Sequence, residues 1–248
     1  MHHVFTTMGT VASVTLPDGS DEELMRAVEI EFESADATFS LYRTDSELSH
    51  INSGRLQLTA SSTEVRRAYA DAMAWGLLTG GAFTPNRPDG AIDLNGIVKA
   101  LAIQKAGVVL DAAGIADWSV NVGGDMLFRG CQPASQPWRT GIVDPADRQA
   151  LLCAVDLPVA RRAVATSGGA ERGDHIWRGG TPTPPEFIQV TVLADSIIEA
   201  DVIATAIIAG GPTMLDEMTQ RCDIDVLAVY RNGDLLATPG FRAALSPV

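Results

Sequence analysis

The spacing of hydrophobic and polar residues predicts a chain in which strands and helices mix. Residues 8–16 alternate as a half-buried strand does, and the turn-forming segment PDGSDEE leads into a helix from about Glu22 to Ala37. The apolar residues of this helix recur at helical spacing and are expected to face the core: Leu24, Val28, Phe32 and Ala35. A second helix is expected from about Ser62 to Leu78, ended by the pair Gly80 and Gly81.

The second half of the chain repeats this mixture. Asp93 precedes a segment that reads as a capped helix, and DWSVNVGGDMLFRG reads as a strand, a glycine turn and a strand. Four short strands follow in WRTGIVDP, LLCAVDLPVA, RRAVATS and FIQVTVLA. A helix from about Ser196 to Ala209 and a closing hairpin around Asn232 and Gly233 complete the pattern. Strands and helices neither alternate strictly nor segregate, so the pattern predicts an α+β fold with mixed or antiparallel sheets.

Length and charge narrow the class of partner. The 248 residues suit one large domain or two lobes around a cleft, and the formal charge of -13 disfavours nucleic acid and anionic membranes. A phosphate-rich ligand would therefore need local cations, a metal ion or helix N-termini. Three separated cysteines without a CxxC pair are expected to be buried free thiols.

Targeting signals are not evident in the sequence. The first residues lack a basic region and a long apolar run, so we expect a cytoplasmic protein. The most apolar late segment carries Glu199 and Asp201, and we therefore expect no membrane insertion.

Asp201 and Thr205 are the strongest candidates for a metal site. They stand four residues apart on an expected helix, which places both oxygen-bearing side chains on one face. Mg²⁺ takes one or two such ligands and completes its shell with water and substrate phosphates. The alternative is structural: Thr205 bonds back to its own helix and Asp201 is a solvated charge.

Other polar and glycine positions have two interpretations each. Gly123 and Gly124 form either a tight turn or a close approach to a ligand, and the ATSGG segment at 165–169 forms either a loop or an anion-binding nest. Asp93 is a helix cap or a ligand contact. Lys99 reaches a phosphate or extends to solvent, and the lone His175 is more often structural than catalytic.

Nine segments taken in order resemble the FAD:protein FMN transferase (ApbE) family. They are MGT, SLYRTDSELSHIN, GGAF, DLNGIVKALAIQKA, NVGGDM, WRTGIVDP, VATSGG, HI and ADVIATA, and they cover residues 4 to 240. The resemblance implies a single catalytic domain over residues 1–248, two-lobed and T-fold-like, with FAD in a cleft and Mg²⁺ on its pyrophosphate. It implies transfer of FMN from FAD to a Thr or Ser hydroxyl of an acceptor flavoprotein, with release of AMP.

The same resemblance assigns residues to this site. Asp201 and Thr205 match the metal-binding pair, and Gly96 matches a backbone carbonyl ligand. The positions that match FAD contacts are Met8, Tyr42, Ala82, Phe83, Thr84, Asp93, Lys99, Gly123, Gly124, Ser167, His175 and Ile176. Asp201 is the first candidate to orient or deprotonate the acceptor hydroxyl, and Lys99 and His175 are further candidates for catalysis.

The sequence departs from the family pattern on one wall of this site. Thr84 stands where an aspartate is expected after Phe83, Ala170 replaces an aromatic residue, and the segment after His175 lacks its aspartate. Two alternatives therefore remain beside transfer: hydrolysis of FAD to FMN and AMP, and FAD binding without catalysis. A third, a metal-dependent hydrolase unrelated to flavin, requires the ordered matches to be coincidental.

Overall fold

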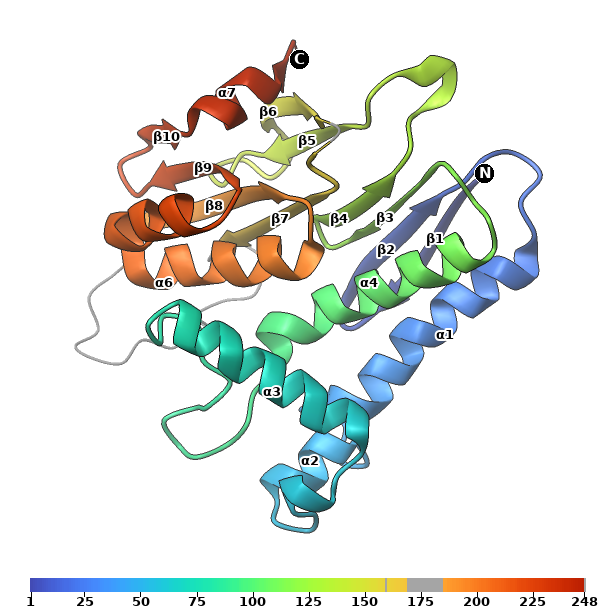
Figure 1. The fold of residues 1–248 in the computed structure, drawn as a ribbon, viewed down its shortest axis with the longest axis vertical. Coiled ribbons are helices and arrows are strands. Elements are labelled where there is room, and N and C mark those ends of the chain that lie inside the picture. Colours follow the sequence, from blue (N-terminus) through green and yellow to red (C-terminus); the bar gives the residue numbers. More distant parts are fainter. Residues whose placement is uncertain (159, 169–184, 248) are drawn as a thin grey trace.

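A large antiparallel sheet forms the centre of the computed structural model, which describes residues 1–158, 160–168 and 185–247 (Figure 1). Its eight strands follow the order β1-β2-β3-β4-β7-β8-β9-β10. Their bounds are β1 His2–Thr7, β2 Thr10–Thr15, β3 Trp118–Val122, β4 Asp125–Arg129, β7 Ala163–Gly168, β8 Phe187–Ala194, β9 Asp225–Tyr230 and β10 Leu235–Ala237. A smaller sheet has the order β11-β6-β5, with β5 Arg139–Val143, β6 Leu151–Asp156 and β11 Leu245–Ser246.

Three long helices cover one face of the large sheet. The helices are α1 Glu22–Phe39, α2 Glu47–Asn52, α3 Thr63–Leu78, α4 Asn95–Ala112, α6 Ile197–Arg221 and α7 Pro239–Ala244, with short 3₁₀ turns at Leu58–Ala60 and Pro133–Ser135. Figure 1 shows α1, α4 and α6 side by side along this face, with α3 and α2 beyond them. The α+β prediction is confirmed, and every strand pairing within the two sheets is antiparallel.

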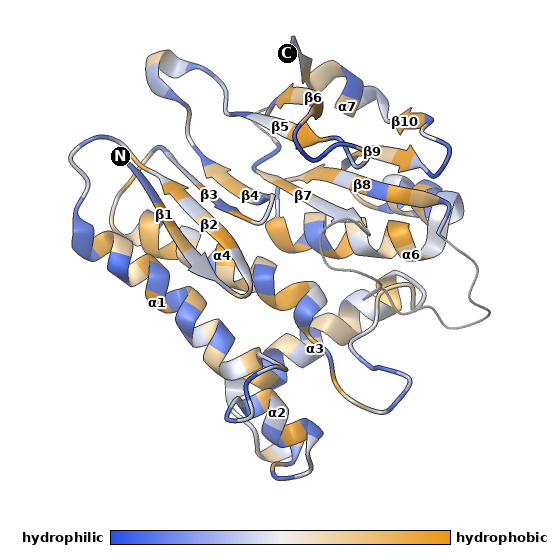
Figure 2. Cartoon of the chain, turned by 180° about the vertical axis from the view of Figure 1, so that it is seen from behind, coloured by the Kyte–Doolittle hydropathy of each residue, from blue (hydrophilic) through white to orange (hydrophobic). Residues whose placement is uncertain are grey.

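Two apolar layers hold the fold together. The larger layer lies between the helices and the large sheet, where Phe32, Ile103 and Trp118 are fully buried. The smaller layer joins the other face of that sheet to the small sheet and α7, and includes Phe128 and Phe241. Each such side chain stabilises the folded state by about 2 kcal/mol through burial. Hydrophobic residues accordingly line α6, whereas α1 alternates hydrophilic and hydrophobic residues (Figure 2).

The predicted elements agree with most of these bounds. The helix expected from Glu22 to Ala37 is α1, although Met25 is buried and Leu24 is only half-buried. Strand β1 and helix α2 were not predicted, because β1 is an edge strand with few apolar residues and α2 has only six residues. The three cysteines are free but half-buried, so the expectation of buried thiols was only partly correct.

Helix α6 runs beyond its predicted end because it is two helices joined at a kink. Gly211 has φ 68° and ψ -155°, a backbone conformation that is essentially restricted to glycine, and Pro212 follows it. Among the described residues, α6 is the one helix that is long and apolar enough to cross a membrane, and 61% of its apolar window is buried. A kinked helix that is mostly buried against β7 and β8 is equally typical of a protein core.

Candidate active site

The glycine turns of the candidate site project from one end of the large sheet. Residues Met8 and Gly9 join β1 to β2, and Gly123 and Gly124 join β3 to β4. Because β2 pairs antiparallel with β3, with Ala12 opposite Val122, the two turns lie beside each other. Strand β7 runs antiparallel to β4, so its C-terminal residues reach the same end.

Both turns hold strained or glycine-specific backbone. Met8 has φ 48°, which is uncommon for a residue with a side chain, and Gly123 and Gly124 have φ 59° and 92°. A Cβ on Gly123 would lie 2.8 Å from Thr10 Oγ1, so this glycine also permits close packing against β2. The tight-turn interpretation is therefore correct, and contact with FAD stays a prediction for these three residues.

The expected metal pair lies where α6 crosses β7. Asp201 is only 5% exposed, and Thr205 Oγ1 lies 3.0 Å from Ser167 Oγ on β7. The helix begins as predicted, with the Ser196 side chain accepting from the backbone N–H of Glu199. Burial excludes the interpretation of Asp201 as a solvated charge. The resemblance assigned Thr205 to metal binding and Ser167 to contact with FAD, and the structure brings their hydroxyl groups into contact.

Lys99 is buried and forms an ion pair with Asp125. The Lys99 side chain is 7% exposed and that of Asp125 is fully buried, so the lysine does not extend to solvent. Asp125 Oδ1 also accepts a hydrogen bond from the backbone N–H of Thr166 at 3.1 Å. One carboxylate thus ties α4 to the glycine turn and to β7, and the buried charges compensate each other. Lys99 as a phosphate contact or catalytic group stays a prediction.

Asp125 is a residue that the sequence analysis missed. The sequence does contain a feature that indicates it: Asp125 directly follows two glycines and is the first residue of a strand that is otherwise largely apolar. A carboxylate in a buried strand requires a partner, and the one buried lysine among the described residues is that partner.

A second group of predicted residues lies at the start of α4. The backbone N–H of Asp93 donates to Pro85 O at 2.8 Å, which places the Ala82–Thr84 stretch beside the residues that precede the helix. Asp93 Oδ1 accepts from Asn95 N at 2.9 Å, so Asp93 caps the helix from one residue outside the formal cap, Leu94. Asp93 therefore has a structural role at the start of α4, but it is not the N-cap residue that the sequence predicted, and its contact with FAD stays a prediction.

Gly96 allows Phe83 to pack against the first turn of α4. A Cβ at Gly96 would lie 2.8 Å from the Phe83 ring, which is 5% exposed. Carbonyls in the first turn of a helix accept from the residue four positions later, so only the second lone pair of the Gly96 carbonyl is available to a metal ion.

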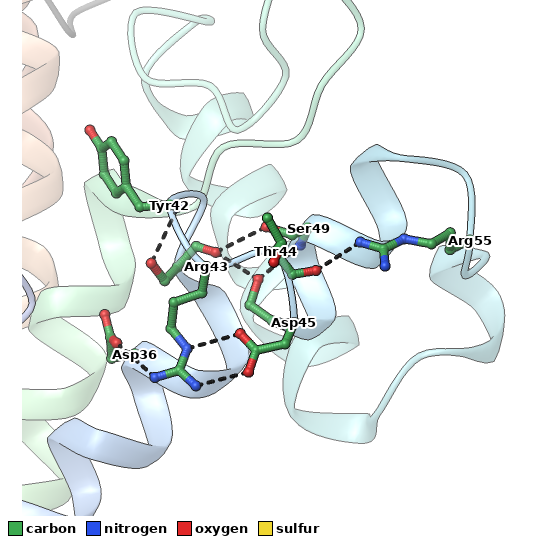
Figure 3. Close-up of polar contacts among 9 residues, drawn as sticks. Asp36, Tyr42, Arg43, Thr44, Asp45, Ser49 and Arg55 are labelled. Carbon is green, nitrogen blue, oxygen red and sulfur yellow. Dashed lines mark hydrogen bonds and ion pairs between the residues drawn. The ribbon is translucent and has the colours of Figure 1, made fainter.

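Tyr42 stands on a loop between α1 and α2 that polar contacts hold in place (Figure 3). Its side chain is 85% exposed. The Ser40 carbonyl accepts from Ser46 Oγ at 2.6 Å and Ser49 Oγ at 3.2 Å, and the Arg55 guanidinium donates to Thr44 O at 2.8 Å.

Arg43 adds charge to the same loop. It forms ion pairs with Asp45 at 3.1 Å and with Asp36 at 3.7 Å. The hydrogen bond from Arg43 lowers the pKa of the Asp45 carboxyl below its ordinary value. The exposed Tyr42 ring is therefore presented on a braced loop.

His175 and Ile176 lie outside the described residues, so their predicted roles are not placed by the structure. Within the described ranges no group of three or more His, Cys, Asp or Glu side chains could hold a metal ion. The expected magnesium donors are instead the Asp201 carboxylate, the Thr205 hydroxyl and the Gly96 carbonyl. These three oxygen donors suit a hard cation that keeps water and phosphate as its other ligands.

Fold and site together define an α+β protein with its chemistry-bearing residues at one end of an antiparallel sheet, where α4, α6 and two glycine turns converge. The model of the ApbE family matches residues 8–87 and 85–228. The chain therefore belongs to the ApbE family.

Curated relatives agree with this assignment over part of their length. The chain is 28% identical over 170 residues to the FAD:protein FMN transferase of Salmonella typhimurium, covering 64% of this chain and 47% of that protein. It is 33% identical over 186 residues to the enzyme of that name from Rhodobacter capsulatus, covering 69% and 34%. The alignments thus span about half or less of each relative.

Solved structures share the fold over nearly the whole chain. The flavin transferase ApbE from Vibrio cholerae superposes with a TM-score of 0.79 at 22% identity, covering 99% of both chains. The ApbE protein from Thermotoga maritima gives 0.82 at 19% identity, covering 100% of this chain and 99% of that one. At these identities the likeness establishes the fold.

Proposed function

We propose that this protein is a magnesium-dependent FAD:protein FMN transferase, which moves FMN from FAD to a Thr or Ser hydroxyl of an acceptor flavoprotein. The observation that carries the proposal is the meeting of α6 and β7, where buried Asp201 and the Thr205–Ser167 contact lie. Asp125, directly after the glycine turn, accepts from Thr166 N of β7 and pairs with Lys99 of α4, so these groups belong to one site. Membership of the ApbE family and the names of the curated relatives support the same activity.

Different residues of the chain would contact different parts of FAD. Gly123 and Gly124 offer a turn without side chains to the pyrophosphate, and Ser167 offers a hydroxyl. The exposed Tyr42 ring offers a stacking surface for a flat ring system. The start of α4 carries the positive end of the helix dipole, which would favour negative charge against the acidic balance of the whole chain.

The reaction exchanges one phosphorus–oxygen bond for another. The acceptor hydroxyl attacks the phosphorus of the FMN half, a new P–O bond forms, the bond to the bridging oxygen breaks, and AMP leaves with that oxygen. The proton of the hydroxyl passes to a carboxylate or to the leaving phosphate. Asp201 is the carboxylate of the described residues that we assign to orient this hydroxyl.

Asp201, Thr205 and the Gly96 carbonyl would hold the magnesium ion. When bound, the ion supplies positive charge that offsets the charge on the phosphate oxygens during transfer. The protein contributes positioning: the Ser167 contact fixes the Thr205 hydroxyl, and the Lys99–Asp125 pair fixes the glycine turn relative to α4.

Product analysis tests the proposal. The purified protein is incubated with FAD and Mg²⁺, alone and with a candidate acceptor flavoprotein, and AMP release is followed beside flavin fluorescence on a denaturing gel. We expect AMP together with a fluorescent acceptor band. AMP without the band would establish hydrolysis instead, and bound flavin without AMP would establish a binding protein.

A further inference from the structure

Helix α3 exposes an apolar stripe on the side that faces solvent. Ala70, Met73, Ala74 and Leu77 recur at the spacing i, i+3, i+4 and i+7, and all four are exposed. Leu77 is 82% exposed and Met73 is 37% exposed. We call these four residues the α3 stripe.

The α3 stripe is a second apolar face on a helix that already has one. The core side of α3 is buried through Val65, Ala68 and Ala72. A helix on the surface of a soluble domain needs only one apolar face to pack. A contiguous exposed apolar face on such a helix is typical of a surface that contacts another molecule.

A pocket continues this surface toward α1 and α4. It has a volume of about 330 Å³, and its walls include Phe39, Ala68 and Leu101. Arg67 and Asp71 also line the pocket, and each stands three residues before a member of the α3 stripe. Residues three apart are neighbours on a helix surface, so pocket and stripe adjoin. The volume is sufficient for one large apolar side chain.

The charges around this surface differ from those of the whole chain. The charged groups that line the pocket balance, with Arg67 and Lys105 against Glu64 and Asp71. Arg66, exposed on the same helix, adds one positive charge. The whole chain carries -13. Glu64 is moreover ion-paired with Lys105. The surface therefore suits an apolar side chain flanked by acidic groups, which the rest of the molecule would repel.

The C-terminal end of the α3 stripe leads into the candidate site. Helix α3 ends at Leu78, and the Ala82–Thr84 stretch follows after a short turn. The Met73 sulfur lies 3.2 Å from the Asn86 side-chain nitrogen, and Leu78 O accepts from Arg221 at the end of α6. A protein seated on the stripe would thus lie beside the loop that packs on Gly96.

We propose that the α3 stripe and its pocket dock the acceptor flavoprotein, through an apolar anchor side chain flanked by carboxylates; this inference rests on the proposed function. The surface is small and partly formed by alanine. It fits a transient contact that releases its product after each transfer. Docking there raises the local concentration of the acceptor hydroxyl without changing the bond exchange.

Steady-state transfer kinetics with a purified acceptor flavoprotein test the docking surface. Leu77→Glu should raise the KM for the acceptor about tenfold, the effect of losing one anchor contact. Its kcat and its affinity for FAD should stay at the wild-type values. Arg67→Glu should raise the same KM, and the wild-type KM should rise with salt. Leu235→Glu is the matched control, because Leu235 is 55% exposed on β10 at the sheet edge.

The outcomes separate the two proposals. Wild-type protein that transfers no FMN to any acceptor overturns the proposed function and this inference with it. Wild-type transfer with an unchanged acceptor KM in both Leu77→Glu and Arg67→Glu overturns the docking surface alone. An equal rise in KM for Leu235→Glu also overturns it, since the effect would then not be local.

Discussion

Two buried carboxylates are central to the candidate site, because burial limits how a charged side chain can be stabilised. Asp201 is 5% exposed on α6, and Asp125 is fully buried at the start of β4. A carboxylate at such a position must be compensated by a cation, by hydrogen bonds or by a change of protonation. Asp125 is compensated by Lys99 and by the backbone of Thr166, and we assign Asp201 to the metal ion and the acceptor hydroxyl.

Replacing Asp201 with alanine should reduce magnesium-dependent AMP release by at least about 100-fold, the scale of losing one stabilising group at a reacting phosphate. FAD affinity should fall only moderately, because the predicted contacts to both ring systems would remain. Stopped assays of AMP and fluorescence titration of FAD measure the two quantities. Asp195→Ala, at an exposed carboxylate just before α6, is the control. Unchanged turnover in Asp201→Ala would remove this residue from the site.

Replacing Lys99 with methionine should destabilise the fold by about 3 kcal/mol, because Asp125 would be left as an uncompensated buried charge. The double variant Lys99→Met with Asp125→Leu should recover part of this loss, since it leaves only the Thr166 N–H without its acceptor. Urea denaturation measures both. Additive losses in the double variant would show that the two side chains do not stabilise each other.

At the scale of elements, edge and surface contacts fix how helices lie on the sheet. Strand β1 is an edge strand, and α1 packs beside it. His3 Nε2 of β1 lies 2.6 Å from Glu29 Oε1 of α1, and Arg26 also donates to Glu29. The hydrogen bond from His3, followed by that from Arg26, lowers the pKa of the Glu29 carboxyl.

The Glu29 contact predicts a pH-dependent contribution to stability. A lowered carboxyl pKa stabilises the fold above the ordinary value of 4.5, and this contribution is lost as the pH falls through the lower folded value. Glu29→Gln should therefore be less stable than wild type by about 1 kcal/mol at pH 6, with the difference vanishing at lower pH. Urea denaturation from pH 6 downward measures it. A constant difference across this range would contradict the assignment.

Helices and strands could be predicted from the sequence where the spacing of apolar residues and the turn-forming residues indicated the same element. The helices α1, α3 and α4 and the hairpin β3–β4 follow from apolar spacing and glycine pairs. The short α2 and the edge strand β1 lack such periodicity. The second half of α6 was missed because Gly211 and Pro212 predict an end, whereas the chain passes through a kink and continues as a helix.

At the scale of the molecule, the site depends on contacts that sequence spacing cannot show. Ser167 and Thr205 are 38 positions apart in the sequence, and Lys99 and Asp125 are 26 positions apart. At such separations the sequence alone does not show that the side chains are in contact. Resemblance to the family placed Ser167, Thr205 and Lys99 in the site, but Asp125 was left out because its partner lies on another element. The spacing of apolar residues along α3 likewise does not show that the α3 stripe is exposed, because a buried face has the same spacing.

The proposed binding of FAD would require local compensation of the overall negative charge. The chain carries -13, so the pyrophosphate of FAD would need the metal ion and the positive end of the α4 helix dipole to offset this repulsion. The central claim is that these parts together transfer FMN to a protein hydroxyl.

Intact-mass spectrometry of an acceptor flavoprotein tests this claim most directly. The acceptor is incubated with this protein, FAD and Mg²⁺, beside reactions with Asp201→Ala and with an acceptor whose target Thr or Ser is replaced by alanine. We predict that the acceptor gains the mass of one FMN less water with wild-type protein alone, and gains none in either comparison. An acceptor of unchanged mass beside full release of AMP and free FMN would contradict transfer and assign the site to hydrolysis.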